Sequence, residues 1–256
     1  MQVMSGFVRK PRLTGFSCML VLGGALAAAA MVSAQGMAPS TGMDKQTSFA
    51  GMQNFPGGWS AVNGEKGVAN VRDGVLQISP STDTNLFRSP GGNFDVMNAP
   101  MVLFAPAENF TLKTKISAQL VGAYDVGAMV LYEDDMHWAK LCFENSGLHE
   151  ATIVSVVTRE RSDDVNSETI ASPFVYMAIA RKGNEFSMHF SRDGQQWRLV
   201  RHFQVPFGAK LRVGFTAHTF SNKQFSAGFS EIVYRATAPE NMRQLKPSEV
   251  ADRQDK

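Results

Sequence analysis

The chain has 256 residues, and its 25 basic and 23 acidic side chains leave a net charge of +2. No segment gathers lysines and arginines into the basic face or arm that a nucleic-acid-binding protein needs, so we expect no nucleic-acid partner. A chain of this length can bury a substantial core in one domain without disulfide bonds.

The N-terminus has the features of a signal peptide. An apolar, alanine-rich run from residue 16 to 32 follows three basic residues, Arg9, Lys10 and Arg12. Small residues come next, and we predict cleavage after Ala34, which makes residues 1–34 the signal peptide. An uncleaved anchor is the alternative, but the run is shorter than the ~20 residues that a spanning helix prefers. The sequence therefore predicts an exported protein, periplasmic or extracellular, without membrane attachment after cleavage.

The number and positions of the cysteines indicate a domain without a disulfide bond. Cys18 lies inside the predicted signal peptide, so cleavage leaves Cys142 alone. A single cysteine in an exported domain is usually buried as a small apolar residue. A nucleophilic role would require a nearby base and a lowered pKa, and no Cys–His pairing is evident.

After the signal peptide the chain opens with a linker and loop-rich strands. Residues 35–48 are rich in Met, Ser, Thr, Gly and Pro and predict a flexible linker. We place the domain at residues 49–235. Asp73-Gly74 between two apolar runs predicts a hairpin. Residues 82–106 are expected as a long loop with a short strand at Leu86 and Phe87, and such loops often carry binding elements.

The stretch from residue 124 to 164 predicts three consecutive antiparallel strands. Side chains alternate between the two faces of a strand, so one face of the middle strand is apolar and carries Ala139, Leu141 and Phe143. The other face carries Trp138, Lys140, Cys142 and Glu144. Lys140 and Glu144 would lie roughly 13 Å apart, at ~3.3 Å per residue, too far for an ion pair. Each therefore needs a partner on a neighbouring strand, solvent or a ligand.

Further strands complete an all-β domain. They are expected at residues 109–120, 174–181, 185–191, 199–205, 211–219 and 225–234. Asp193-Gly194 is interpreted as a structural hairpin turn. Residues 236–256 contain two prolines and mixed charges, which predicts a polar C-terminal tail with at most a short helix. About a dozen short strands without an amphipathic helix indicate two packed antiparallel sheets.

Several motifs, in this order, resemble those of one family. They are Tyr124-Asp125-x-Gly127, Trp138-x-Lys140 with Glu144, Val156-Val157-Thr158, Ser162-Asp163 and Ser191-x-Asp193-Gly194-x-x-Trp197. Together they resemble a widespread family of concanavalin A-like lectin/glucanase domains, some fungal members of which carry the label "regulation of enolase". The resemblance implies a jelly-roll β-sandwich with a concave sheet. The family commonly has Ser-Asp-Trp where this chain has Ser162-Asp163-Asp164, so an aromatic ring that would stack on a sugar is absent at that point.

Carbohydrate binding on the concave face is the first functional hypothesis. A sugar site needs an aromatic ring for the apolar side of the sugar and charged or amide groups for its hydroxyls. We expect the ligand-binding residues to be Trp138, Lys140, Glu144, Arg159 and Asp163, if neighbouring strands align them. The expected partner is a glycan or polysaccharide.

Two alternatives remain open, and the sequence does not decide whether the protein is an enzyme. The first is a glycoside hydrolase acting on a β-glucan-type polysaccharide, which needs two carboxylates ~5–5.5 Å apart for retention or ~6.5–9.5 Å for inversion. No Glu-x-Asp-x-(x)-Glu run of the laminarinase type occurs, and Glu144 could pair with Asp163 only across strands. The second is a structural or protein-interaction module of the cell envelope.

No cofactor or metal is expected. The five histidines are scattered without the paired spacing of a zinc site. Asp134 and Asp135 could join a structural calcium site, but acidic residues in a surface turn are commoner.

Overall fold

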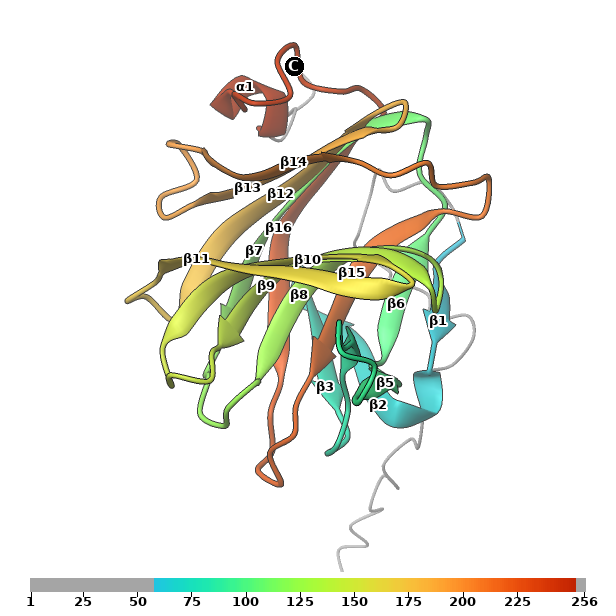
Figure 1. The fold of residues 1–256 in the computed structure, drawn as a ribbon. Coiled ribbons are helices and arrows are strands. Elements are labelled where there is room, and N and C mark those ends of the chain that lie inside the picture. The colour runs from blue at the N-terminus through green and yellow to red at the C-terminus, as the bar shows by residue number, and fades with distance from the viewer. Residues whose placement is uncertain (1–57, 252–256) are drawn as a thin grey trace, which may run out of the picture. The chain divides into compact units, whose positions relative to one another are not determined.

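The computed structural model describes residues 58–251, and nearly all of this part of the chain is β-structure arranged as two large sheets (Figure 1). The predicted signal peptide, the linker and the first residues of the predicted domain lie outside the described residues. The predicted fold class is confirmed: the protein is a jelly-roll β-sandwich of antiparallel sheets.

The first seven-stranded sheet, here called sheet A, has the strand order β1-β6-β15-β8-β9-β10-β11. Its strands are β1 (Ser60–Val62), β6 (Met101–Phe104), β8 (Val126–Asp134), β9 (His137–Asn145), β10 (Ala151–Arg159), β11 (Arg161–Thr169) and β15 (Arg212–His218). The predicted run of three strands in residues 124–164 corresponds to β8, β9 and β10. Ser162-Asp163-Asp164 lies in β11, a polar edge strand of the sheet that the sequence did not predict.

The second seven-stranded sheet, sheet B, has the order β14-β13-β12-β7-β16-β3-β2. Its strands are β2 (Gly67–Arg72), β3 (Val75–Pro80), β7 (Asn109–Ala118), β12 (Phe174–Lys182), β13 (Glu185–Ser191), β14 (Arg198–Gln204) and β16 (Ala227–Arg235). The predicted Asp73-Gly74 hairpin joins β2 to β3, and both turn residues have positive φ, 51° and 75°. This geometry matches the twist of the strands that the turn connects.

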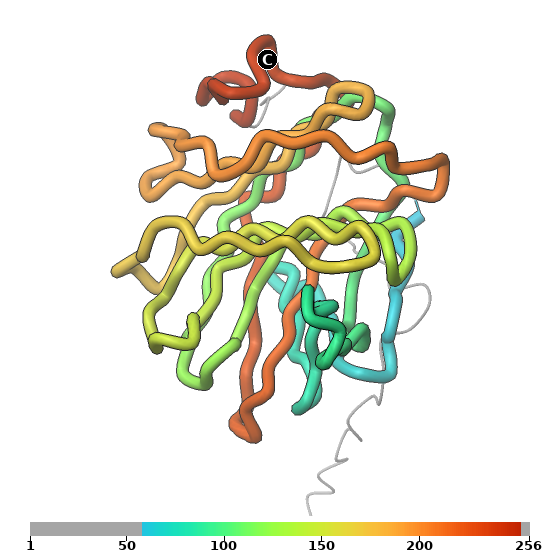
Figure 2. Tube along the Cα trace, viewed as in Figure 1, coloured from blue at the N-terminus to red at the C-terminus, as the bar shows by residue number. Residues whose placement is uncertain are grey.

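A small third sheet lies outside the sandwich. It pairs β4 (Leu86–Arg88) with β5 (Asp95–Met97). Both strands fall in the predicted loop 82–106, which also contains β6 of sheet A. Figure 2 shows this part of the chain, in teal and green, below the β10–β11 hairpin, in yellow. We call β4, β5 and their connection the β4–β5 cover.

The main core fills the space between sheets A and B. It takes alternate side chains from both sheets, including the predicted apolar face of β9: Ala139, Leu141 and Phe143. Gly127 on β8 permits a close approach of the sheets, because a Cβ atom there would lie 2.8 Å from Ala227 and 2.9 Å from Ile116. Half-buried Trp59 packs edge-on against Phe104 with ring centroids 4.8 Å apart, as expected of a core residue.

A second apolar cluster lies on the outer face of sheet A. It contains Trp138 and Cys142 of β9, together with alternate residues of β6, β8 and β10, and Phe87 and Met97 of the β4–β5 cover pack against it. A sheet face in contact with water would not gather so many buried apolar side chains. The cover therefore turns part of this outer face into interior.

The segment after β16 packs on sheet B. It contains the short helix α1 (Pro247–Val250), and its Leu245 and Val250 are buried with Ala178 of β12, with Trp197 beside them. His189 of β13 also contacts the backbone carbonyl of Met242, at 3.1 Å. Part of the predicted polar tail thus supplies apolar side chains to a third small cluster. Among residues 58–251 no helix is long and apolar enough to cross a membrane.

Candidate functional site

A pocket of about 520 Å³ opens on the outer face of sheet A. Its walls combine strand residues with residues of the β4–β5 cover and of loops at one end of the sandwich. The described residues that line it are Asn85, Phe87, Phe94, Tyr124, Lys140, Glu144, Val154, Val156, Asp164, His218 and Phe220. Pockets of this size with mainly apolar walls and a few polar groups are typical small-ligand sites.

Strand β9 provides the charged part of the floor. Lys140 and Glu144 point to the same outer face as Trp138 and Cys142, as the alternation in the sequence predicts. Both line the pocket, so the two side chains share one depression although they are four residues apart. Strand β9 is almost entirely buried, and Lys140 and Glu144 on its outer face bring two charged side chains to the pocket floor.

Lys140 is held by His218 of β15. The Lys140 Nζ lies 3.0 Å from His218 Nε2, and only 2% of Lys140 is exposed. Burial, and then the charge of Lys140, place the pKa of His218 well below its usual value, so the ring is neutral. The ammonium therefore donates to Nε2, and the proton of the ring is on Nδ1, which is buried and has no hydrogen-bond partner.

Glu144 is a carboxyl group in a poorly solvated place. Burial raises its pKa above the usual value, and the charge of Lys140 opposes this effect. Asp164 of β11 raises the pKa further by repulsion. Two carboxyl groups and one ammonium group thus act on each other across the floor.

Four aromatic rings form the mouth of the pocket. Their centroids follow one another at 6.5 Å from Phe87 to Phe94, 6.0 Å from Phe94 to Phe220, and 6.3 Å from Phe220 to Tyr124. Phe94 and Tyr124 are 41% and 45% exposed, which is unusual for rings of this size. We call these four residues the aromatic rim.

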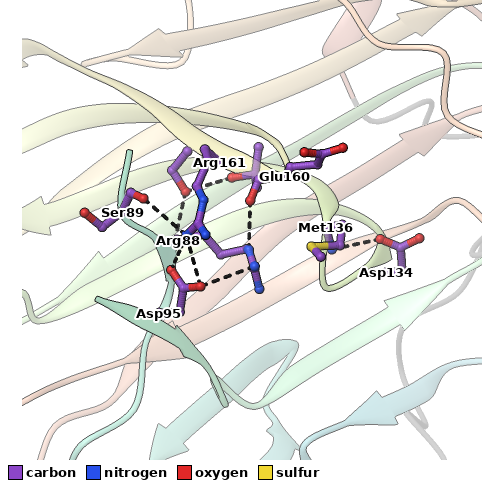
Figure 3. A network of polar contacts seen from close by, with 9 residues as sticks. Arg88, Ser89, Asp95, Asp134, Met136, Glu160 and Arg161 are labelled. Atoms are coloured by element: carbon purple, nitrogen blue, oxygen red, sulfur yellow. Dashed lines mark hydrogen bonds and ion pairs between the residues drawn. The ribbon is translucent and has the colours of Figure 1, made fainter. Parts of the chain in front are cut away.

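The β4–β5 cover is attached to sheet A by a network of polar contacts (Figure 3). Arg88 donates from Nε to the carbonyl of Glu160, at 2.8 Å, and forms an ion pair with Asp95, at 3.2 Å. Arg161 donates to both carboxylate oxygens of Asp95, at 2.8 and 3.0 Å. The backbone of Glu160 continues the network to Met136 in the β8–β9 turn. Because the network fixes both β4 and β5, it positions the rim residues Phe87 and Phe94 over the sheet.

A buried carboxylate holds the opposite part of the rim. Asp125 is 2% exposed, and its Oδ2 accepts hydrogen bonds from the backbone of Val121 and Gly122, at 3.0 and 2.6 Å. Its Oδ1 accepts from the Thr219 hydroxyl, at 2.5 Å. Tyr124 and Phe220 are the chain neighbours of these residues, so the Asp125 carboxylate fixes two loops that carry the rim.

The comparison with protein families agrees with the motifs in the sequence. The model of a family described as "Protein of unknown function (DUF1349)" matches residues 62–237. The chain belongs to DUF1349. No curated protein matches this DUF1349 chain, and the "regulation of enolase" label that the resemblance implies stays a prediction.

Solved structures share the fold. A functionally unknown protein from Saccharomyces cerevisiae is 22% identical, with a TM-score of 0.65, and the match covers 72% of the DUF1349 chain and 97% of the yeast chain. A xylan β-1,4-xylosidase from Bacillus halodurans C-125 is 13% identical, with a TM-score of 0.53, covering 66% of this chain and 38% of that one. The GH43 protein BlXynB from Bacillus licheniformis is 15% identical, with a TM-score of 0.53, covering 64% and 33%. The DUF1349 chain therefore spans little more than a third of these two longer chains, and the likeness concerns the fold.

The structure separates the five residues that the sequence singled out. Lys140 and Glu144 line the pocket, whereas Trp138 is fully buried below the cover. The Nζ atom of Lys140 lies 6.0 Å from the centre of the Trp138 ring. Arg159 is exposed at the end of β10 and does not line the pocket. Asp163 forms an ion pair with Arg201 of sheet B, at 2.8 Å. Their expected convergence in one cleft is thus limited to Lys140 and Glu144.

Sequence reasoning missed several lining residues. Asp164 faces the pocket because it pairs with Val156, which is on the outer face, whereas Asp163 pairs with the inward-facing Val157. Its position is that of the tryptophan which the resembling family commonly has. His218 and Phe220 approach from β15 and its following loop, and no sequence signal connects them with β9. For Phe94, the only feature in the sequence that pointed to the site was an aromatic residue directly after a run of turn residues.

Two other groups considered in the sequence, Cys142 and Asp193, lie outside the pocket and have structural roles. Burial raises the pKa of the Cys142 thiol to about 12, which suits the expected buried apolar cysteine. Asp193 accepts hydrogen bonds from the backbone of Gln195 and Gln196 and closes the predicted turn. Within residues 58–251 no group of three or more His, Cys, Asp or Glu side chains is placed to hold a metal ion.

Proposed function

We propose that this DUF1349 chain is an exported carbohydrate-binding module whose ligand occupies the pocket of sheet A. The observation that carries the proposal is the combination of an aromatic rim with a charged floor in one pocket of about 520 Å³. Partly exposed rings pack against the C–H faces of a sugar, and the charged groups of the floor form hydrogen bonds with its hydroxyls. Phe94 and Tyr124 would supply the rings, and Lys140, Glu144 and Asp164 the polar contacts.

The fold relatives support this ligand class. Two of the solved structures with this sandwich are a xylan β-1,4-xylosidase and a GH43 protein. The part of each that resembles this chain is about a third of its length, which is the size of an accessory module. A fold alone does not determine a ligand, so the lining residues of the pocket carry the argument.

Calorimetric titration with a panel of oligosaccharides tests the proposal. Xylohexaose, cellohexaose and laminarihexaose are titrated into the full chain and into its Phe94→Ala and Glu144→Gln variants. We expect binding of at least one panel member, weakened about tenfold or more by Phe94→Ala, since fully burying a phenylalanine side chain contributes about 1.5–3 kcal/mol. Leu148→Ala is the matched control, because Leu148 is an exposed apolar residue outside the pocket. Equal binding by Phe94→Ala and the control would contradict the proposed site.

Hydrolysis is a second candidate, and the raised pKa of Glu144 supports it because a proton donor needs such a shift. The second carboxylate would be Asp164. The register places the two Cα atoms four residues along and two strands across, roughly 16 Å apart at ~3.3 Å per residue and ~4.8 Å per strand. Both ranges for a catalytic pair, ~5–5.5 Å and ~6.5–9.5 Å between carboxyl groups, are shorter than this Cα separation, so catalysis would require the two side chains to lean toward each other. Release of reducing ends from the same panel, abolished by Glu144→Gln, would establish catalysis.

Export is proposed on the N-terminal sequence. The mature chain purified from its native host is expected to begin at Gln35, which mass spectrometry of the intact protein measures. A mature chain that retains residues 1–34 would contradict cleavage and favour an anchored protein.

A further inference from the structure

A second hollow, of about 470 Å³, lies on the outer face of sheet B, on the side of the sandwich away from the pocket. It is at one end of β7, β12 and β16. The described residues that line it are Gln77, Ser117, Ala118, Gln119, Pro173, Phe174, Gln224, Phe225, Ser226 and Gly228. We call this hollow the sheet B trough.

The centre of the trough is one row of residues across four neighbouring strands. Strand pairing aligns Gln77 with Gly228, Gly228 with Ser117, and Ser117 with Phe174. All four point outward, because their chain neighbours Leu76, Ile116 and Phe229 are in the main core. Two small residues thus lie between two large ones. The walls stand on strands three spacings apart, so their Cα atoms are separated by roughly 14 Å at ~4.8 Å per spacing.

Both walls are held in place by neighbouring side chains. The Lys115 Nζ lies 4.2 Å from the centre of the Phe174 ring, and Tyr176 meets the same ring edge-on at 6.2 Å. Glu231 fixes this arrangement, since it accepts a hydrogen bond from the Tyr176 hydroxyl and lies 3.8 Å from the Lys115 Nζ. On the other wall, the Gln77 side chain donates to the Ser226 hydroxyl at 3.0 Å. A wall that is already ordered loses little conformational entropy when a ligand binds.

The backbone conformation at Glu231 also helps to hold the Phe174 wall. Glu231 has a φ of 48°, in the left-handed region that a residue with a side chain rarely adopts, and it lies where the pairing of β16 with β7 shifts register. Such a conformation costs free energy and persists where the surroundings impose it. Here it directs the carboxylate at Tyr176 and Lys115, which are the two groups that hold the Phe174 ring.

The chemistry of the lining points to an uncharged, hydroxyl-rich ligand. None of the residues that line the trough is ionisable, whereas three carry a side-chain amide and two a hydroxyl. Amides offer both donors and acceptors, which matches sugar hydroxyls in either role. The half-buried Phe174 supplies one aromatic wall. A charged ligand would find no counter-charge among these lining residues.

We propose that the sheet B trough is a second glycan-binding site, specific for neutral oligosaccharides and independent of the sheet A pocket. One protein molecule would then hold two glycan chains on opposite faces of the sandwich. Bivalent binding of this kind cross-links polymers, because a single short stretch of chain cannot reach both sites. The proposal goes beyond the proposed function, which concerns the pocket alone.

Amide NMR spectroscopy of the full chain tests the trough directly. Xylohexaose, cellohexaose and laminarihexaose are each titrated into wild type and Ser117→Trp, in which an indole fills the floor from an outward-facing strand position. We expect at least one oligosaccharide to shift the amide signals of Gly228 and Phe174 in wild type. The same shifts should require at least tenfold more oligosaccharide in Ser117→Trp. Ser167→Trp is the control, since Ser167 is an exposed strand serine that lines neither hollow.

The outcomes separate this inference from the proposed function. Shifts near Phe94 without shifts near Gly228 would leave the pocket intact and overturn the trough. Shifts near Gly228 that survive Phe94→Ala, and that Ser117→Trp removes, support the trough even if the pocket takes another ligand. Trough shifts that Ser117→Trp leaves unchanged would overturn it, as would the lack of any response to all three oligosaccharides.

Discussion

The pocket of sheet A and the trough of sheet B are hollows of similar volume that arise in different ways. The trough is centred on one row of sheet B, in which two small residues lie between two large ones, and residues of the adjoining connections line the rest. The pocket exists only because the β4–β5 cover and two loops raise an aromatic rim above the sheet. The pocket has one buried ammonium group, that of Lys140, and two carboxyl groups, whereas the residues lining the trough are uncharged. Burying an ion costs free energy unless it is paired or hydrogen-bonded, and in the pocket His218 accepts the hydrogen bond of the ammonium group.

The largest expected effect concerns the aromatic rim, which the pocket has and the trough lacks. Asp125→Ala removes the carboxylate that accepts two hydrogen bonds within its own loop and one from Thr219 in the other rim loop. We expect the free energy of unfolding to fall by about 3 kcal/mol, because buried donors lose their partner, and pocket binding to fall more than tenfold. Urea unfolding and calorimetry measure the two effects. The trough signals should keep their shifts. Asp125→Asn, which retains one acceptor oxygen, should lie between wild type and Asp125→Ala; an unaltered rim in Asp125→Ala would contradict the assigned role.

The next effect concerns the buried cation. Lys140→Met keeps the length of the side chain but removes the only ammonium group among the residues that line the pocket. We expect about tenfold weaker oligosaccharide binding there, since a hydrogen bond from a charged group contributes about 1.5–3 kcal/mol. Calorimetry measures this effect, and Lys182→Met, at an exposed strand end, is the control. Equal losses in the two variants would show that charge alone, and not its place in the pocket, matters.

Ligand binding in the pocket should depend on pH, whereas binding in the trough should not. Burial raises the pKa of Glu144 above its usual 4.5, so the group takes up a proton earlier than an ordinary glutamate as the pH falls. Pocket binding that uses the carboxylate as an acceptor should weaken a few-fold between about neutral pH and about 4.5. His218 stays neutral over this range, because its pKa is lowered. Titrations at several pH values test this; Glu144→Gln should give a flatter profile, and the trough shifts should not change.

The same shift has an effect on stability, with the opposite sign from that of most carboxylates. The folded protein binds the Glu144 proton more tightly than the unfolded chain does. Wild type should therefore gain stability relative to Glu144→Gln as the pH falls through the raised pKa, and the gain should be complete below about 4.5. Urea midpoints of the two proteins over this range measure it. A gain in the reverse direction would contradict the raised pKa.

The smallest effects are expected at the two predicted site residues outside the pocket. Asp163→Ala breaks an ion pair with Arg201 whose aspartate is 62% exposed, so it should cost less than about 1 kcal/mol of stability. Arg159→Ala changes an exposed strand end. Both variants should bind pocket ligands within about twofold of wild type in calorimetry. A tenfold loss in either would mean that the ligand extends beyond the pocket to this edge of the sheet.

The sequence predicted the sandwich and the faces of β9 because both depend on local alternation. Lys140, Glu144 and the apolar face of β9 were placed correctly for that reason. Strand β11 was missed since it is a polar edge strand, in which Val165 is the only aliphatic residue. Without that strand its register was unknown, and a register error of one residue exchanges the faces. Asp163 was therefore expected in the site instead of Asp164.

The remaining parts of the site depend on contacts between distant segments. His218 is 78 residues from Lys140, and the Phe94–Phe220 contact joins two loops that no motif connects. The four-residue strand β6, between Pro100 and Pro106, is too short for a clear periodic signal. Such features require the tertiary structure, since patterns within one sequence window do not report on them.

The attachment of the β4–β5 cover has an evolutionary consequence. Arg88 and Asp95 form an ion pair that fixes the two strands of the cover, and residues 89–94 form the connection between them, outside both large sheets. Substitutions or short insertions in this connection would reshape one wall of the pocket and leave the hydrogen-bonded sheets unchanged. A chain with this fold could thus acquire a different ligand preference through a segment outside the two large sheets, because connecting loops tolerate sequence change better than the strands they join.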